Sequence, residues 1–396
     1  MVRGVEWLGA RPKVLYLTHI KRPKCRACLV FIRSAAFSHL MMFLSATKIW
    51  TVRWFRRVPD PLTRSMLMLN VAQALWGAMV MAILLPHGIA GAQATATSLT
   101  RAQFDAMLAR VDNSSRWGPQ DELGTLNLIT PDVRRAAASE LRNGTSISLA
   151  REITPASKGE FIPTTIDFIH IADSVLGPSD NSVMWAGEKV GLFYHGPAHT
   201  HIDALSHLSY LGRAYNRRTV SRHEGPPDHG RIDAMRDGLM SRGVLVDVPR
   251  LRASQRATTE APLSTEDLIA WERQTGVRIR SGDIVLVRSG RWNSAKPLAG
   301  SVGVHPAVAE WLRERGVAAF GDEGGTDMSP TPVAGINSPF HVLAIVGMGM
   351  PLIENLDLER VASEAVKRSR WTFLFVAAPL RIQAGTGSAI NPLAVF

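Results

Sequence analysis

Four short apolar runs, separated by segments with helical signals, constrain the fold of this chain more than any other feature. The runs are VLVDV at 244–248, DIVLVRSG at 283–290, VAAFGDE at 317–323 and TFLFVAAPL at 372–380. Short continuous apolar runs of this kind are typical of buried strands. Because strands and helices alternate along the chain, we expect an α/β fold, a single domain with a mixed central sheet from about residue 100 to the C-terminus.

Helix boundaries between these runs are marked by capping residues. Ser264 and Asp267 form a capping box for a helix that reaches Gln274 and ends at Gly276. The other expected elements are, in chain order, a helix over 131–141, strands over 147–150 and 190–194, and a helix with Pro306 at its first position.

Residues 1–94 form a basic leader. They carry thirteen Lys and Arg against two acidic residues, so the remaining chain has equal numbers of basic and acidic residues. The formal net charge of +11 therefore indicates no nucleic-acid partner for the folded part. An apolar run at 74–85, followed by an A-x-A ending at 92–94, predicts cleavage after Ala94 and export to the periplasm or the medium. An uncleaved membrane anchor is the alternative.

The leader is long for a signal peptide, and a gene start placed too far upstream, with the true start near Met41 or Met42, would explain its length. Both cysteines, Cys25 and Cys28, lie in this leader. The domain that we expect over residues 95–396 therefore has no cysteine, which excludes a thiol nucleophile, a cysteine-ligated zinc and a structural disulfide there.

The stretch YHGPAHTHIDALSHL, at 194–208, holds four of the twelve histidines of the chain and one aspartate. In an extended segment, residues two apart face the same side, so His199, His201 and Asp203 would converge on one point. His207 follows Asp203 by four residues and shares its face in an extended or a helical segment. Convergent imidazoles and a carboxylate predict a metal site. The alternative is a solvated histidine-rich loop, or histidines that are each hydrogen-bonded in the core.

A metal site of this kind usually needs ligands from a second segment. In FHVLAIVGMGMPLIENLDL, at 340–358, His341 and Glu354 flank an apolar stretch that is bent at glycine and proline. Taken alone, each is ambiguous. A lone histidine beside an apolar run is commonly a satisfied core residue, and Glu354 could be a favourable charge near a helix N-terminus.

THIDALSH resembles the signature H-x-G-T-H-x-D-x-P-x-H of the metal-dependent cyclase-like hydrolase family, which includes bacterial kynurenine formamidases and isatin hydrolases. Three further segments resemble parts of its members: RWGPQDELGTLNLIT at 116–130, HVLAIVGMGMPLIENLDL at 341–358 and APLRIQAGTGSAINPLAVF at 378–396. The likeness spans residues 115–396. It implies a swivelling β/β/α type of fold and a homodimer.

The resemblance also implies roles for individual residues. His201 and Asp203 would bind the metal, which would be a divalent ion such as zinc or manganese. His341 and Glu354 would complete one or two metal sites. His207 would be the catalytic acid/base.

The chain departs from the pattern at its first histidine, which falls on Pro197. A proline cannot ligate a metal. We therefore expect His199, in phase with His201, to replace it, with His195 as the alternative.

We expect a metal-dependent hydrolase that opens an amide C–N bond in an N-formyl aryl amine or a small cyclic amide. A divalent ion lowers the pKa of bound water toward about 7, and an imidazole can move the proton at neutral pH. The resemblance implies an arylformamidase acting on N-formylkynurenine, although the export signal argues against a dedicated enzyme of tryptophan breakdown. A lactone or ring hydrolase like isatin hydrolase, or a cyclase, is the first alternative. An exported metal- or ligand-binding protein without turnover is the second.

Three other features have a functional and a plain interpretation. Asp322 and Asp327 in GDEGGTD would support the metal ligands from behind, or lie in a solvated turn. Arg381 would bind a substrate carboxylate, or be an ordinary surface arginine. The long loops at 213–228 and 322–339, rich in glycine, proline and polar residues, are expected to rim the active site.

Overall fold

The computed structural model describes residues 98–154, 165–169, 187–220, 225–253, 255–258, 260–292 and 303–396. The leader with its apolar run and two cysteines lies outside the described residues, so its expected export function stays a prediction. Among the residues described, no helix is both long and apolar enough to cross a bilayer.

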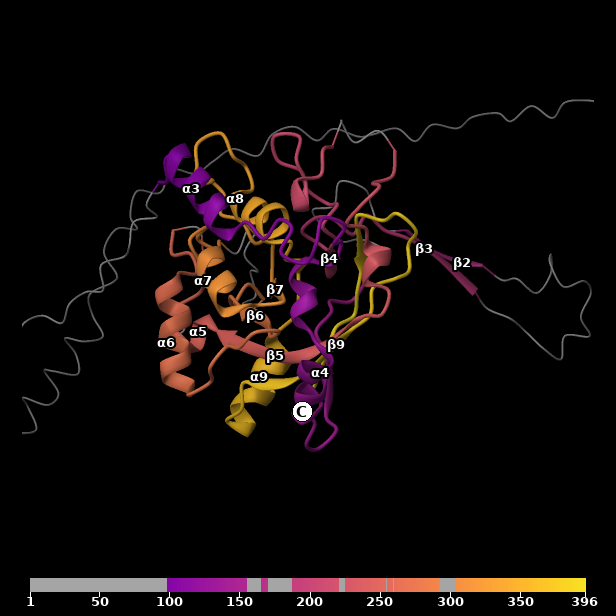
Figure 1. The fold of residues 1–396 in the computed structure, drawn as a ribbon. Coiled ribbons are helices and arrows are strands. Elements are labelled where there is room, and N and C mark those ends of the chain that lie inside the picture. Colours follow the sequence, from indigo (N-terminus) through magenta and orange to yellow (C-terminus); the bar gives the residue numbers. More distant parts are fainter. Residues whose placement is uncertain are drawn as a thin grey trace, which may run out of the picture. The chain divides into compact units, whose positions relative to one another are not determined.

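A mixed nine-stranded sheet forms the centre of the fold (Figure 1). Its strands are, in spatial order, β1 (Ser146–Ser148), β11 (Leu393–Val395), β9 (Thr372–Ala377), β5 (Leu239–Asp247), β6 (Ile284–Arg288), β7 (Ala319–Asp322), β8 (Leu352–Glu354), β4 (His201–Asp203) and β10 (Gly387–Ala389). Strands β5, β6, β7 and β8 are parallel to their neighbours in this series, and the outer pairs are antiparallel. The expected α/β domain with a mixed sheet is confirmed.

The four apolar runs all form central strands of this sheet. Every residue of β6 and β7 is buried, and so are the last five residues of β5. Parallel strands covered on both faces need such continuous apolar sequences, because neither face meets water.

The helices and helical turns connect these strands. They are α3 (Arg101–Val111), α4 (Pro131–Ala138), α5 (Val248–Leu251), α6 (Thr265–Thr275), α7 (Val308–Arg315), α8 (Pro339–His341) and α9 (Glu359–Arg368), the 3-10 turns η1 (Gly124–Leu128), η2 (Tyr215–Arg217) and η3 (Ile232–Met235), and the π-helical segment η4 (Val342–Met348). Figure 1 shows α5, α6 and α7 together beside β5, β6 and β7.

Helix α6 has the boundaries that its capping residues predict. The Ser264 side chain accepts from the Asp267 N–H, the Asp267 side chain accepts from the Ser264 N–H, and Gly276 ends the helix at a φ of 71°. The fully buried Trp271 then ties α6 to β5, because its indole N–H donates to the Leu245 carbonyl oxygen at 2.9 Å.

Some expected boundaries were wrong. The strand placed at 190–194 is β3 (Gly187–Gly191), which ends before the histidine stretch and pairs with β2 (Thr165–Ile169) in a separate two-stranded sheet. Pro306 begins a turn, in which Ala309 N–H donates to its carbonyl, and α7 starts two residues later. Helix α4 ends at Ala138, three residues early, and β1 covers 146–148 instead of 147–150.

A close backbone contact joins η1 to the end of η4. The Gly349 carbonyl oxygen accepts from the Thr125 N–H at 2.9 Å, and a Cβ on Gly124 would lie 1.9 Å from the same oxygen. Gly124 also has a φ of +54°. Glycine is therefore required here by both space and conformation. The contact fixes the chain five residues before Glu354.

We predict that Gly124→Ala lowers the free energy of unfolding by about 1 to 3 kcal/mol more than Gly118→Ala does. Gly118 also has a positive φ, of +97°, but nothing lies within 4 Å of its would-be Cβ, so the comparison isolates the steric clash. Denaturant unfolding of both variants measures the difference. Equal losses of unfolding free energy in the two variants would show that the backbone at Gly349 moves aside without an energetic penalty.

Candidate metal centre

Strand β4 brings two polar side chains of the histidine stretch to one face of the sheet. His201 and Asp203 alternate with Ile202, which points into the core, and all three residues are buried. His201 lies opposite Glu354 of β8 and Asp203 lies opposite Gly387 of β10. The sheet register therefore places a second carboxylate beside His201.

The ligand atoms fall into two groups that share Asp203: His195, His201 and Asp203 in one, and Asp203, His341 and Glu354 in the other. In the first, Asp203 Oδ1 lies 3.0 Å from His195 Nδ1 and 3.5 Å from His201 Nε2. In the second, His341 Nε2 lies 3.7 Å from Asp203 Oδ2 and 3.3 Å from Glu354 Oε1. All the ligand atoms of each group lie within 4.8 Å of one another, which suits coordination of one or two metal ions.

The Asp203 carboxylate shows why these residues fit a cation. It is 1% exposed, and neither of its oxygens accepts a hydrogen bond, although imidazole nitrogens approach both. A buried carboxylate without donors is costly. A divalent cation between the oxygens and the ring nitrogens would remove that cost. Mixed histidine and carboxylate ligands suit zinc, manganese and several other ions.

Contacts on the far side of each imidazole fix which nitrogen faces Asp203. His201 Nδ1 donates to the His199 carbonyl oxygen at 2.9 Å, so Nε2 is the free acceptor. The Nδ1 of His341 hydrogen-bonds to Asp327, and His195 Nε2 lies 3.1 Å from the Thr386 hydroxyl oxygen. Such outer contacts orient metal ligands and set their tautomers.

The loop before α8 holds the second group in place. Asp327 also accepts from the Phe340 N–H at 2.6 Å, and it is 8% exposed. Glu354 Oε1 accepts from the Thr326 N–H and hydroxyl at 2.9 and 2.8 Å. Of the two interpretations of Asp327, the structure therefore favours support of a ligand over a solvated turn. Nothing in the sequence alone paired Asp327 with His341, or Thr326 with Glu354.

The structure gives to His195 the place that we expected for His199. Residues 195–199 form a bend and not a strand, with Gly196 at a φ of 143°, so the alternation begins only at His201. His199 is buried and belongs to neither group, and its carbonyl oxygen orients His201. Gly387 makes room for His195, because a Cβ there would lie 2.6 Å from His195 Cε1.

His207 lies at the edge of the cluster. Its Nε2 is 4.0 Å from Asp203 Oδ1, its side chain is 28% exposed, and its ring stacks on His195 with centroids 4.1 Å apart and planes 16° apart. Burial lowers the pKa of His207 to about 4, although the charge of Asp203 acts to raise it. At neutral pH this imidazole is uncharged and can accept a proton.

The pKa values of Asp203 and His341 move in opposite directions. Burial acts to raise the pKa of Asp203, but His207, His195, His341 and His201 hold it well below its usual value. Burial acts to lower the pKa of His341, but Glu354, Asp327 and Asp203 raise it well above its usual value. Without a metal, His341 therefore carries the positive charge that these carboxylates require.

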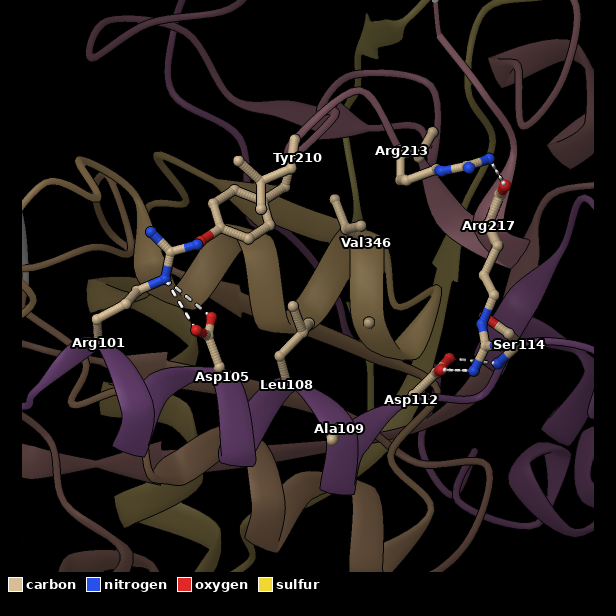
Figure 2. Close-up of a pocket in the computed structure, with 13 residues that line it drawn as sticks. Arg101, Asp105, Leu108, Ala109, Asp112, Ser114, Tyr210, Arg213, Arg217 and Val346 are labelled. Atoms are coloured by element: carbon tan, nitrogen blue, oxygen red, sulfur yellow. Dashed lines mark hydrogen bonds and ion pairs between the residues drawn. The ribbon is translucent and has the colours of Figure 1, made fainter.

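A cavity of about 410 Å³ lies elsewhere, between α3, η4 and the start of the 213–228 loop (Figure 2). None of the metal-binding candidates lines it. Its charged groups pair with one another, as Arg101 does with Asp105 and Arg217 with Asp112. The start of this loop thus borders a separate cavity, whereas the 322–339 loop contributes directly to the metal centre.

We predict that His195→Gln lowers the metal content of the purified protein, because it disrupts the group with His201 and Asp203, whereas His199→Gln leaves the metal content unchanged. Removal of one ligand from a three-residue group leaves too few donors, but the His199 contact to His201 comes from its backbone. Metal content by plasma mass spectrometry on purified protein measures both, with circular dichroism as the check on folding. Metal loss in His199→Gln alone would restore His199 as the ligand.

Metal affinity should also rise with pH. A metal must displace the proton that His341 holds, so affinity should increase by up to about tenfold per pH unit below the pKa of His341. Competition with a chelator between about pH 6 and about pH 8 measures this slope. Asp327→Asn, which weakens the support of His341, should lower affinity by about 10- to 100-fold. An affinity that is constant over this pH range would contradict the prediction.

Comparison with known proteins shows which family and which solved structures this chain is similar to. Residues 146–327 match the profile of the family named "Putative cyclase". A crystal structure of a novel cyclase has 25% sequence identity and a TM-score of 0.63, and the match covers 73% of this chain and 99% of the other. Isatin hydrolase A from Ralstonia solanacearum has 22% identity and a TM-score of 0.45, over 67% and 97% of the two chains. A predicted metal-dependent hydrolase from Bacillus stearothermophilus has 17% identity and a TM-score of 0.42, over 64% and 98%.

Comparison with curated proteins gives no match. The matched segment contains β4, His195 and His207, and the novel cyclase structure shares the fold that surrounds them. Over residues 146–327, which include the whole histidine stretch, this chain is similar to the cyclase family.

Proposed function

We propose that this protein is a metal-dependent hydrolase that opens an amide C–N bond, with an N-formyl aryl amine such as N-formylkynurenine as its substrate. One observation carries the proposal: the buried Asp203 carboxylate has no hydrogen-bond donor and faces imidazoles from two segments of the chain, with a neutral histidine at the exposed edge. Metal-assisted amide hydrolysis uses a cation, a water and a group that moves protons, and this arrangement can supply or hold each of them.

The two groups that share Asp203 would hold a divalent ion, zinc or manganese. When bound, such an ion lowers the pKa of a coordinated water toward about 7 and polarises a substrate carbonyl. His201 and His341 present their Nε2 atoms to it, because their Nδ1 atoms are already hydrogen-bonded.

His207 would take a proton from the attacking water through Nε2 and return it to the leaving nitrogen. An amine leaves as a neutral molecule only if that nitrogen is protonated, so this transfer is the step that the protein itself has to provide. Asp203 stabilises the imidazolium that forms, and the stacked His195 ring fixes the plane of His207.

A non-catalytic binding protein was supported only by Pro197, which occupies a ligand position in the family signature. His195 can replace that ligand, since its Nδ1 lies 3.0 Å from Asp203 Oδ1. The proposal of a hydrolase is therefore favoured over that of a degenerate site. We further propose, from the leader sequence, that the enzyme acts outside the cytoplasm.

We predict that the metal-loaded protein hydrolyses N-formylkynurenine and that His207→Ala lowers kcat by about 10²- to 10⁴-fold with metal content unchanged. Kynurenine release and metal content are measured on the same samples. Asp203→Ala is the matched control, in which metal and activity should be lost together.

Isatin and an aryl lactone, assayed in parallel, distinguish an arylformamidase from a ring hydrolase. Turnover of a cyclic substrate alone would keep the metal centre and replace the proposed substrate. Full metal loading without turnover of any of the three would refute the hydrolase.

A further inference from the structure

Two arginines from distant parts of the chain lie against one tryptophan. The guanidinium carbon of Arg151 is 3.8 Å from the centre of the Trp292 ring, and that of Arg291 is 4.6 Å from it. Stacking on an aromatic face stabilises a guanidinium and leaves its N–H groups free to donate in the plane of the guanidinium.

Among the described residues, these two guanidinium groups lack a carboxylate partner, unlike three other partly or fully buried arginines. Arg291 is 5% exposed, and its Nε and Nη1 are buried without a hydrogen-bond partner. Within the described part of the chain, Arg151 makes no hydrogen bond or ion pair through its guanidinium. The contrasting arginines each make two hydrogen bonds to one carboxylate: Arg242 to Asp283, Arg252 to Asp267 and Arg288 to Glu359.

Two positive charges on one ring repel each other, and burial makes that repulsion stronger. Burial lowers the pKa of Arg291, and the charge of Arg151 lowers it further, whereas Asp322 acts in the opposite direction. Neither Asp322 nor Glu323 makes an ion pair with Arg291 among the described residues, and burial raises the pKa of both acids. An anion bound by these guanidinium groups would offset the repulsion and satisfy the buried donors.

The pair is attached to the metal centre through the segments that carry its ligands. The Arg151 N–H donates to the Thr200 hydroxyl at 3.0 Å, next to His201. The Trp292 indole N–H donates to the Leu356 carbonyl at 2.9 Å, two residues after Glu354.

Glu323 holds Arg291 from the other side. Its Oε2 accepts from the backbone N–H groups of Ser289, Gly290 and Arg291 at 2.9, 2.8 and 3.2 Å. Arg291 is thus placed by a rigid turn at the end of β6.

We propose that Arg151, Arg291 and Trp292 form an anion subsite beside the metal centre, which binds a carboxylate that the substrate carries apart from its scissile amide. That the bound carboxylate belongs to a substrate rests on the proposed function, but anion binding at this site does not depend on catalysis. It selects aromatic amides with a carboxylate, since a planar carboxylate matches the guanidinium groups and an aromatic ring can pack against Trp292. Arg381, the sequence candidate for this role, is exposed on the surface.

The test is calorimetric titration of the full chain with benzoate and with its neutral analogue benzamide, both in the metal-loaded form and after chelation. Benzoate should bind both forms more tightly than benzamide. Arg291→Gln and Arg151→Gln should each weaken benzoate binding at least about tenfold and leave benzamide binding unchanged, because each removes a charged hydrogen-bond donor. Arg381→Gln, the matched control, should bind benzoate like the unmodified protein.

The outcomes separate this inference from the hydrolase proposal, since binding is scored without turnover. Benzoate binding that disappears on chelation would assign the carboxylate to the metal and overturn the subsite. Equal benzoate affinity in the unmodified chain and both arginine variants, no benzoate binding at all, or a loss confined to Arg381→Gln would also overturn it. If Arg291→Gln does not fold, as judged by circular dichroism, the partly exposed Arg151→Gln and the charge-retaining Arg291→Lys decide the question.

Discussion

The site depends on one buried carboxylate that the protein leaves without a hydrogen-bond donor. Asp203 sits on β4 between two strands, one of which brings Glu354 level with His201 and the other a glycine level with Asp203 itself. Backbone hydrogen bonds of the sheet hold these residues in register, so the repulsion between the Asp203 and Glu354 carboxylates cannot be relieved by small movements. A cation is the component that makes such a rigid arrangement favourable.

The strands and one helix of the fold could be predicted because their signals are local. The runs that form β5, β6, β7 and β9 are buried throughout or nearly so, and the capping box of α6 is complete within four residues. Sheet order could not be read in the same way. It depends on pairings such as β4 with β8, which join residues about 150 apart in the chain.

The residues of the candidate site likewise differ in whether local sequence signals predict them. His201 and Asp203 share a face because they alternate on a strand, and a two-residue spacing is visible in the sequence. His195 was harder to choose over His199, because a bend at Gly196 and Pro197 breaks the alternation that favoured His199. The roles of Asp327 and Arg291 could not be predicted, since they arise from contacts with His341 and Trp292 that no sequence spacing indicates.

Asn355 connects the two charged parts of the site. This fully buried residue has a φ of 55°, and its side-chain amide donates to the carbonyl oxygens of Gly196 and His199 at 2.6 and 3.2 Å. Its neighbours are Glu354, a metal-binding candidate, and Leu356, which anchors Trp292. One turn of backbone therefore sets the position of the histidine bend, the shared metal site and the ring beneath both arginines. A substrate that bridges the cation and the arginine pair would contact groups whose separation is fixed by three consecutive residues. This geometry can therefore select substrates by the distance between their amide and their anionic group.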